Sequence, residues 1–220
     1  MNVTLSLEDQ LVARARKKAE ALGKSLNQMI RDYLQTVAGG DDPERSIEEF
    51  NRLSGQGHSH GWRFNRDEIH TRQDDARQDN ERDNARSSFF DTNVLVYADD
   101  QAAPAKQKRA LELVAEHRRA KTGVVSLQVL QEYFVTVTRK LQVDVSIVRR
   151  KVELLAEFDV AAPEVADILA AIDLHRLHSF SFWDALILRA AKQAGCTVLL
   201  TEDMQQAREI DGVRVVNPFQ

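Results

Sequence analysis

The chain has 220 residues, of which 43% are hydrophobic and 29% charged, with a formal net charge of −4. This length exceeds that of one small domain, and the apolar fraction can fill a core in the longer part of a two-part protein. A single cysteine excludes an internal disulfide, the negative charge excludes a general attraction to nucleic acid, and the absence of a long apolar run or a signal-type start predicts a cytoplasmic protein without membrane contact.

Residues 1–39 predict a strand followed by two helices. Apolar residues alternate over residues 3–7 and then recur at helical spacing over residues 11–22. Gly23 is typical of a helix end, and Ser25 of the cap of a second helix. A unit of this size cannot bury a stable core alone, and its strand leaves unpaired backbone groups. We therefore expect a homodimer that pairs through the strand.

Residues 40–72 form a polar segment that carries two groups of large apolar residues. The anchors are Ile47, Phe50 and Leu53 at helical spacing, then Trp62, Phe64 and Ile69. Polar segments with large anchors commonly fold on a partner surface. Residues 73–87 contain no apolar side chain larger than that of alanine and predict a flexible linker.

Strand and helix patterns alternate over residues 88–220. Strands are expected at 89–91, 122–125, 158–161, 198–200 and 213–216, with helices at 105–119, 127–141, 147–158, 163–177 and 182–194. This alternation predicts a mostly parallel sheet with helices on both faces. The predicted fold class is α/β, with a three-layer α/β/α domain after a small dimerisation domain and an extended tail.

Four acidic side chains of this half lie in apolar surroundings: Asp91, Glu132, Asp184 and Asp203. Asp91 and Asp203 follow buried-type strands, Asp184 lies on the apolar face of a predicted helix, and Glu132 borders an apolar stripe. Four converging carboxylates imply a divalent cation, Mg²⁺ or Mn²⁺, and hydrolytic chemistry. The alternative is that Asp91 and Asp203 are helix N-caps and that hydrogen bonds satisfy the other two acids.

Five segments of this half occur in the order typical of one family. They are Phe89 to Tyr97, Ser126 with Glu132, Ser181 to Ala185, Leu199 to Met204, and Val215 to Phe219. Together they resemble the PIN domain of VapC toxins. The resemblance implies a metal-dependent endoribonuclease. Its catalytic, metal-binding acids would be Asp91, Glu132, Asp184 and Asp203, with Asn93, Ser126 and Thr201 as supporting polar residues.

The N-terminal pattern, with the sequence of residues 23–27 between its two helices, resembles the ribbon-helix-helix fold of VapB antitoxins. This resemblance implies operator DNA binding by paired strands in the major groove. The DNA-contacting residues would be Asn2, Thr4, Ser6 and Ser25. The tail would wrap the toxin and offer Arg63 or Arg66, beside Trp62 and Phe64, to the acidic cleft. The alternatives are a plain dimerisation module and, for the aromatic pair, a structural strap.

The combined prediction is a toxin-antitoxin fusion: an RNA-cleaving enzyme that its own N-terminal part inhibits, with that part also repressing an operator. The domains would be residues 1–39, 40–72, 73–87 and 88–220, and the assembly a dimer or tetramer. Two alternatives stay open. One is a DNA-binding repressor whose PIN-like half is catalytically silent. The other is a phosphatase or DNA nuclease that uses the same four acids.

Overall fold

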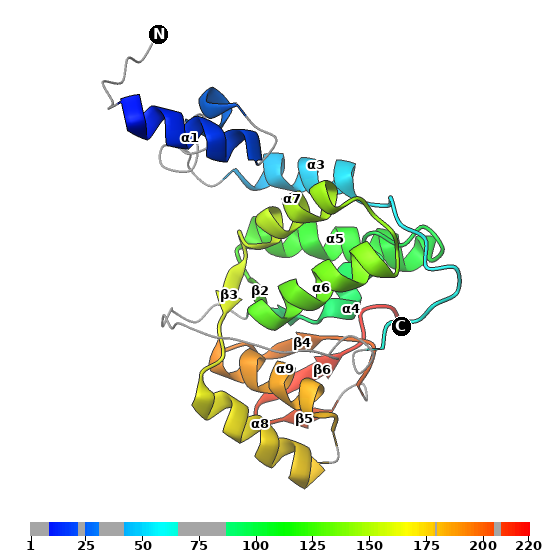
Figure 1. Ribbon diagram of the computed structural model, residues 1–220. Helices are drawn as coiled ribbons and strands as arrows, with labels where there is room; N and C mark the ends of the chain where they lie inside the picture. Colours follow the sequence, from blue (N-terminus) through cyan, green and yellow to red (C-terminus); the bar gives the residue numbers. More distant parts are fainter. Residues whose placement is uncertain (1–8, 22–24, 31–41, 66–86, 179, 205–207) are drawn as a thin grey trace. The chain divides into compact units, whose positions relative to one another are not determined.

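The computed structural model describes residues 9–21, 25–30, 42–65, 87–178, 180–204 and 208–220 (Figure 1). The chain divides into two compact units, residues 1–42 and residues 43–220. Several sequence predictions lie outside the described residues: the strand at 3–7, residues Asn2, Thr4, Ser6 and Arg66, and the linker except for Ser87.

The N-terminal unit contains the first predicted helix as α1, Asp9–Ala21. Ala19 on this helix is buried, whereas Arg14 and Arg16 are exposed. The Ser25 hydroxyl accepts a hydrogen bond from the backbone amide of Gln28 at 3.1 Å, and residues 26–30 are helical. Ser25 is therefore the cap of a second helix, as its position predicted.

The C-terminal unit is built on a six-stranded sheet with the order β3-β2-β1-β4-β6-β5. Its strands are β1 Ser88–Phe90, β2 Gly123–Ser126, β3 Asp159–Ala161, β4 Val198–Leu200, β5 Glu209–Ile210 and β6 Val213–Val216. All neighbours pair in parallel except β5 and β6. Parallel pairing brings the carboxyl ends of β1 and β4 to one edge, because Phe90 lies opposite Leu200.

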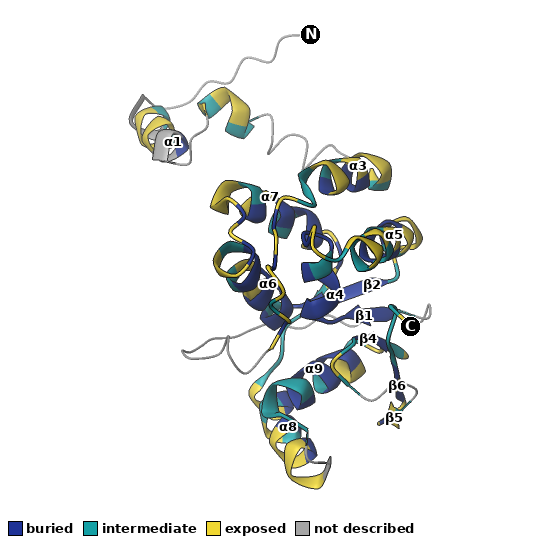
Figure 2. Cartoon of the chain, turned by 90° about the vertical axis from the view of Figure 1, so that its right-hand side faces the viewer, coloured by how far each residue is buried: buried dark blue, intermediate teal, exposed yellow. Residues whose placement is uncertain are grey.

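Helices cover both faces of this sheet, which makes the predicted three-layer α/β/α fold (Figure 1). One face carries α4 Thr92–Tyr97, α5 Pro104–Ala120, α6 Leu127–Arg139 and α7 Val145–Leu155; the other carries α8 Val165–His178 and α9 Phe182–Gln193. Buried residues line the sheet and the inner sides of the helices, and exposed residues lie outside (Figure 2). Within the described ranges, no helix is both long and apolar enough to cross a bilayer.

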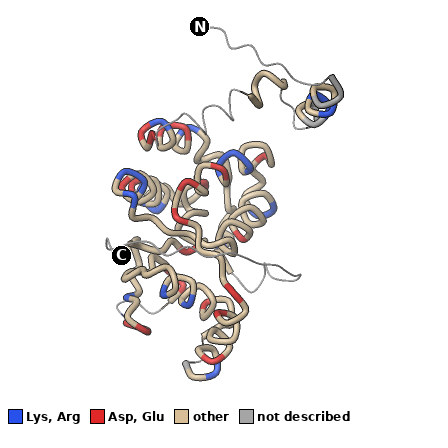
Figure 3. The backbone as a smooth tube through the Cα atoms, turned by 90° about the vertical axis from the view of Figure 1, so that its left-hand side faces the viewer, with Lys and Arg blue, Asp and Glu red and all other residues tan. Residues whose placement is uncertain are grey.

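Neither sign of charge dominates the outer helices. Basic and acidic segments alternate along them (Figure 3).

Cys196 is buried just before β4, and burial raises the pKa of its thiol to about 12. A thiol that remains protonated at neutral pH is a poor nucleophile, so this cysteine fills the core rather than reacting.

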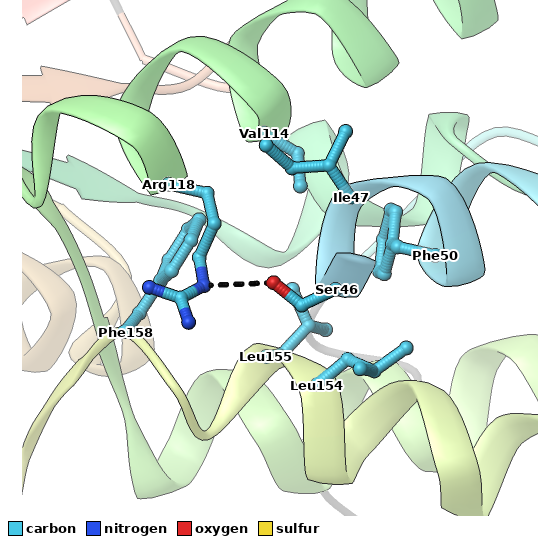
Figure 4. Close-up of a pocket in the computed structure, with 8 residues that line it drawn as sticks. All are labelled: Ser46, Ile47, Phe50, Val114, Arg118, Leu154, Leu155 and Phe158. Carbon is cyan, nitrogen blue, oxygen red and sulfur yellow. Dashed lines mark hydrogen bonds between the residues drawn. The ribbon is translucent and has the colours of Figure 1, made fainter. Parts of the chain in front are cut away.

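A further helix, α3 Pro43–Leu53, packs on α5 and α7 (Figure 4). Its buried side chains are Ser46, Ile47 and Phe50. The helical spacing of the apolar residues in the sequence is confirmed. The Arg118 guanidinium of α5 donates to the Ser46 hydroxyl at 3.1 Å. A cavity of only about 10 Å³ remains between the three helices, close to the volume that one water needs. The α3 helix thus shares one core with the sheet domain.

Lys151 of α7 lies wholly buried beneath α3. Its ammonium donates to the Asp99 carboxylate at 2.6 Å and to the Ser54 hydroxyl at 2.7 Å, and it lies 4.1 Å from the centroid of the Phe50 ring. The Tyr133 hydroxyl donates to the other Asp99 oxygen at 2.6 Å. Burial lowers the pKa of Lys151 and raises that of Tyr133. Residues of α3 and the turn after it therefore cover a buried ion pair.

The chain beyond α3 continues along the same domain. The backbone amide of Gly57 donates to the Asp99 carbonyl at 3.0 Å, and a Cβ at this glycine would lie 2.6 Å from the Leu141 Cβ. Only glycine fits this close approach. Farther on, Phe64 is buried and Trp62 is half-buried, with the Lys140 ammonium 5.3 Å from the Trp62 ring centroid.

Candidate active site

Asp91 lies at the carboxyl end of β1 and has 1% of its surface exposed. Its backbone amide donates to the Leu200 carbonyl at 3.0 Å, which fixes it beside the end of β4. One carboxylate oxygen accepts from the Thr92 amide at 2.7 Å, so Asp91 caps α4. The capping alternative is therefore correct for this residue. It does not exclude a role in the site, because the second oxygen has different partners.

Asn93 connects Asp91 to Asp203 across the edge of the sheet. Its side-chain amide Nδ2 lies 3.0 Å from the second Asp91 oxygen and 2.8 Å from an Asp203 oxygen. The Thr201 hydroxyl donates to the same Asp91 oxygen at 2.6 Å and accepts from the Asp203 backbone amide at 3.2 Å. Asn93 and Thr201 thus hold the two carboxylates beside each other, although Asp203 is exposed and Asp91 is not.

Glu132 of α6 is the second deeply buried acid, with 1% of its surface exposed. One of its oxygens accepts from the Thr92 hydroxyl at 2.5 Å and the other from the Gln128 amide at 2.7 Å. Because Thr92 also donates its backbone amide to Asp91, it joins the two carboxylates. Each of these donors is a neutral amide or hydroxyl. We define the acidic network as Asp91, Thr92, Asn93, Glu132, Thr201 and Asp203.

The remaining predicted residues, Asp184 and Ser126, are placed differently. Asp184 is half-buried in the first turn of α9, where its backbone amide donates to the Ser181 hydroxyl at 3.1 Å. The sequence placed Asp184 on the apolar face of a helix, and its partial exposure follows from its position in the first turn of that helix. Ser126 is buried and caps α6 by accepting from the Val129 amide at 3.2 Å. In the described ranges no three His, Cys, Asp or Glu side chains are close enough to hold a metal together.

Sequence reasoning missed Thr92 and Gln128. Thr92 directly follows Asp91, and Gln128 precedes Glu132 by one helical turn, so both had a signal in their spacing. The other predicted site residues in this unit with described positions belong to the tail: Trp62 is half-buried, Arg63 is exposed and Phe64 is buried.

Comparison with protein families places the C-terminal half of the chain in a family. Residues 88–211, more than half of the chain, match the PIN domain model. The chain belongs to the PIN domain family. Residues 2–75 match a family of unknown function (DUF6364). A search of curated proteins gave no match to the chain.

PIN domains are in general metal-dependent nucleases. The donor chemistry of the acidic network fits a hard divalent cation, because it offers carboxylate, amide and hydroxyl oxygens and no sulfur or imidazole. Two of the carboxylates, those of Asp91 and Glu132, are deeply buried. The Asn93 amide donates to both Asp91 and Asp203.

Proposed function

We propose that this chain is a toxin-antitoxin fusion of the VapBC type. Its PIN domain would be a metal-dependent endoribonuclease, inhibited by the N-terminal part of the same polypeptide. The observation that supports this most directly is the acidic network, in which Asp91 and Asp203 from neighbouring parallel strands share Asn93 and Thr201. Ligand sites of open α/β sheets lie at this edge.

Mg²⁺ or Mn²⁺ would be held by Asp91 and Asp203, which Asn93 joins, and the resemblance to PIN domains of VapC toxins assigns Glu132 and Asp184 to the same set of acids. A bound cation of this kind lowers the pKa of water and stabilises the charge that develops on a phosphodiester in the transition state. Glu132, oriented by Thr92 and Gln128, would orient water or accept its proton. Asn93 and Thr201 would hold the carboxylates of Asp91 and Asp203 next to each other.

The tail, residues 40–72, is proposed to inhibit RNA cleavage while it is bound to the PIN domain. Trp62 and Phe64 contact the PIN domain core, and between them Arg63 remains exposed. A guanidinium pairs strongly with carboxylates, so Arg63 or Arg66 would compete with metal for the acids. The linker would keep the tail at high effective concentration, on its own domain or on a partner's in a dimer or tetramer.

Self-inhibition predicts that the wild-type chain cleaves single-stranded RNA weakly at saturating Mg²⁺ or Mn²⁺. Arg63→Ala/Arg66→Ala should cleave at least about tenfold faster, because losing a charge-assisted bond of roughly 1.5–3 kcal/mol releases the site. Trp62→Ala/Phe64→Ala should also activate, by releasing the anchors. The measurement is the initial rate of RNA cleavage at equal protein and metal, with EDTA as the blank.

The matched control is Arg45→Ala/Arg52→Ala, which removes the same charge from exposed positions of α3. It should leave the rate unchanged. Equal rates for the wild-type chain and the Arg63→Ala/Arg66→Ala chain would leave the tail as a structural strap. No metal-dependent cleavage by any variant would favour the silent-domain alternative, a repressor that only binds DNA.

Operator binding is the second activity proposed for this chain. Residues 1–40 should dimerise and bind a palindromic operator, with an affinity that falls steeply as salt rises because phosphate contacts release counterions. Asn2→Ala/Thr4→Ala should reduce specific binding more than nonspecific binding, since base contacts rather than phosphate contacts are lost. Fluorescence anisotropy with operator and scrambled DNA measures both. A monomeric fragment would contradict the proposal.

A further inference from the structure

Four side chains gather directly beside the acidic network without belonging to it. They are Tyr97 at the end of α4, Lys106 in the first turn of α5, Glu202 after β4, and Phe219 near the C-terminus. Glu202 stands between Thr201 and Asp203 in the sequence, so whatever fixes Glu202 acts on two members of the network. We define these four residues as the Lys106 cluster.

Glu202 receives two donors from this cluster. The Lys106 ammonium donates to one of its oxygens and the Tyr97 hydroxyl to the other. Lys106 also donates to the Tyr97 hydroxyl at 2.9 Å, which closes the triangle. Only 18% of the Glu202 side chain is exposed. A charge-assisted pair that is partly buried and has a second donor is held more firmly than an exposed ion pair.

Two aromatic rings lie close to the ammonium. The Lys106 nitrogen lies 4.2 Å from the centroid of the Tyr97 ring and 5.4 Å from that of Phe219. The rings themselves pack edge to face with centroids 5.0 Å apart. Burial, together with the Glu202 carboxylate, raises the pKa of Tyr97, so its hydroxyl keeps the proton that it donates.

The acidic network holds the same turn. The Asp203 backbone amide donates to the Thr201 hydroxyl at 3.2 Å, and the Asp203 side chain is exposed. The backbone amide of Glu202 lies 3.4 Å from Asn93 Oδ1, while Asn93 Nδ2 donates to Asp203 at 2.8 Å. Asn93 thus holds the turn through the Glu202 backbone amide and the Asp203 carboxylate, whereas the Lys106 cluster holds it through the Glu202 side chain.

We infer that Lys106 is a positioning residue for Asp203: it holds Glu202 with the help of Tyr97 and Phe219, and Glu202 sets the turn that brings Asp203 to Asn93 and Asp91. The effect on metal binding rests on the proposed function of the acidic network. The effect on the order of the turn does not, because it follows from the hydrogen bonds alone. The two consequences are therefore measured separately.

The test uses the full chain with Lys106→Met, which keeps the length and the apolar stem but removes the charge. Hydrogen exchange of the amides at residues 201–204 should become about fivefold faster, as expected for one lost net hydrogen bond. Mn²⁺ affinity, measured by electron paramagnetic resonance of free Mn²⁺, should fall about tenfold, as for other groups that orient metal ligands. The affinity is measured in the wild-type and the Arg63→Ala/Arg66→Ala backgrounds.

Two further variants keep the inference testable if Lys106→Met folds poorly. Tyr97→Phe retains the ring and removes only the hydroxyl, so it should shift both readouts in the same direction by less. Lys106→Arg keeps the charge, so its hydrogen exchange at residues 201–204 and its Mn²⁺ affinity should be close to those of the wild-type chain. The matched control is Lys108→Met on the same helix, where the side chain is 81% exposed and lies 4.0 Å from Glu112. It should change neither readout.

The exchange rates test whether Lys106 orders the turn, and the Mn²⁺ affinities test whether it positions Asp203 for metal. Unchanged exchange at residues 201–204 in both Lys106→Met and Tyr97→Phe overturns the inference. Faster exchange with unchanged Mn²⁺ affinity shows that Lys106 orders the turn but does not position Asp203 for metal, which also overturns it. Absence of Mn²⁺ binding by the wild-type chain and by the Arg63→Ala/Arg66→Ala chain overturns the proposed metal site instead, and the exchange rates alone then decide whether Lys106 sets the turn.

Discussion

Asp91→Asn is expected to lower metal-dependent RNA cleavage by on the order of a thousandfold, since a cation supplies several kcal/mol of transition-state stabilisation and each 1.4 kcal/mol is tenfold in rate. Asparagine keeps the oxygen that caps α4 by accepting from Thr92. It places an amide where the second carboxylate oxygen accepts from Asn93 and Thr201, so charge and acceptor are lost together. The measurement is the cleavage rate in the wild-type and Arg63→Ala/Arg66→Ala backgrounds.

Asp144→Asn is the control for the capping role of Asp91. Asp144 caps α7 by accepting from the Ser146 amide at 2.8 Å, and it is exposed and distant in sequence from the acidic network. Its replacement should leave RNA cleavage unchanged. A wild-type rate for Asp91→Asn, or equal losses in the two variants, would remove Asp91 from the proposed site.

Phe50→Ala is expected to lower the free energy of unfolding of the C-terminal unit by about 3–5 kcal/mol. Phe50 has 2% of its surface exposed and belongs to the same core as the sheet. Its ring also covers the Lys151 ammonium at 4.1 Å, so truncation removes a cation–π contact as well as apolar burial. Urea denaturation followed by circular dichroism measures the change.

Leu177→Ala is the matched control for an apolar truncation. Leu177 is 76% exposed on α8, and its replacement should change stability by no more than about 0.5 kcal/mol. Comparable losses for Leu177→Ala and Phe50→Ala would mean that α3 contributes little to the core. A large loss for Phe50→Ala alone would show that residues before the PIN match stabilise this domain.

Most of the PIN fold was predictable because its elements have clear periodicity. Strands β4 and β6 have the bounds predicted from their apolar runs. Helix α5 is one residue longer than predicted at each end, and α9 is one residue shorter at its C-terminus. The α4 helix was missed because it has only six residues, too few to show a helical period. The β5 strand has two residues, too few for any period to be recognised.

The candidate site was predictable in its residue types but not in its connections. Asp91, Asn93, Thr201 and Asp203 lie within three residues of the ends of β1 and β4, a position that sequence patterns reveal. The contact of Tyr97 with Glu202 joins residues 105 positions apart and depends on the pairing of β1 with β4, which no local pattern specifies. Lys151 follows two exposed arginines in the sequence, yet it is buried because α3 covers it.

The burial of Lys151 has a consequence for following this protein in solution. Amine-reactive reagents modify only lysines that they can reach, and the Lys151 amine is enclosed by Asp99, Ser54 and the Phe50 ring. Acylation of Lys151 would therefore mark molecules in which α3 has dissociated from α5 and α7. The chain carries a built-in chemical reporter of that release, and its readout requires neither RNA, metal nor DNA.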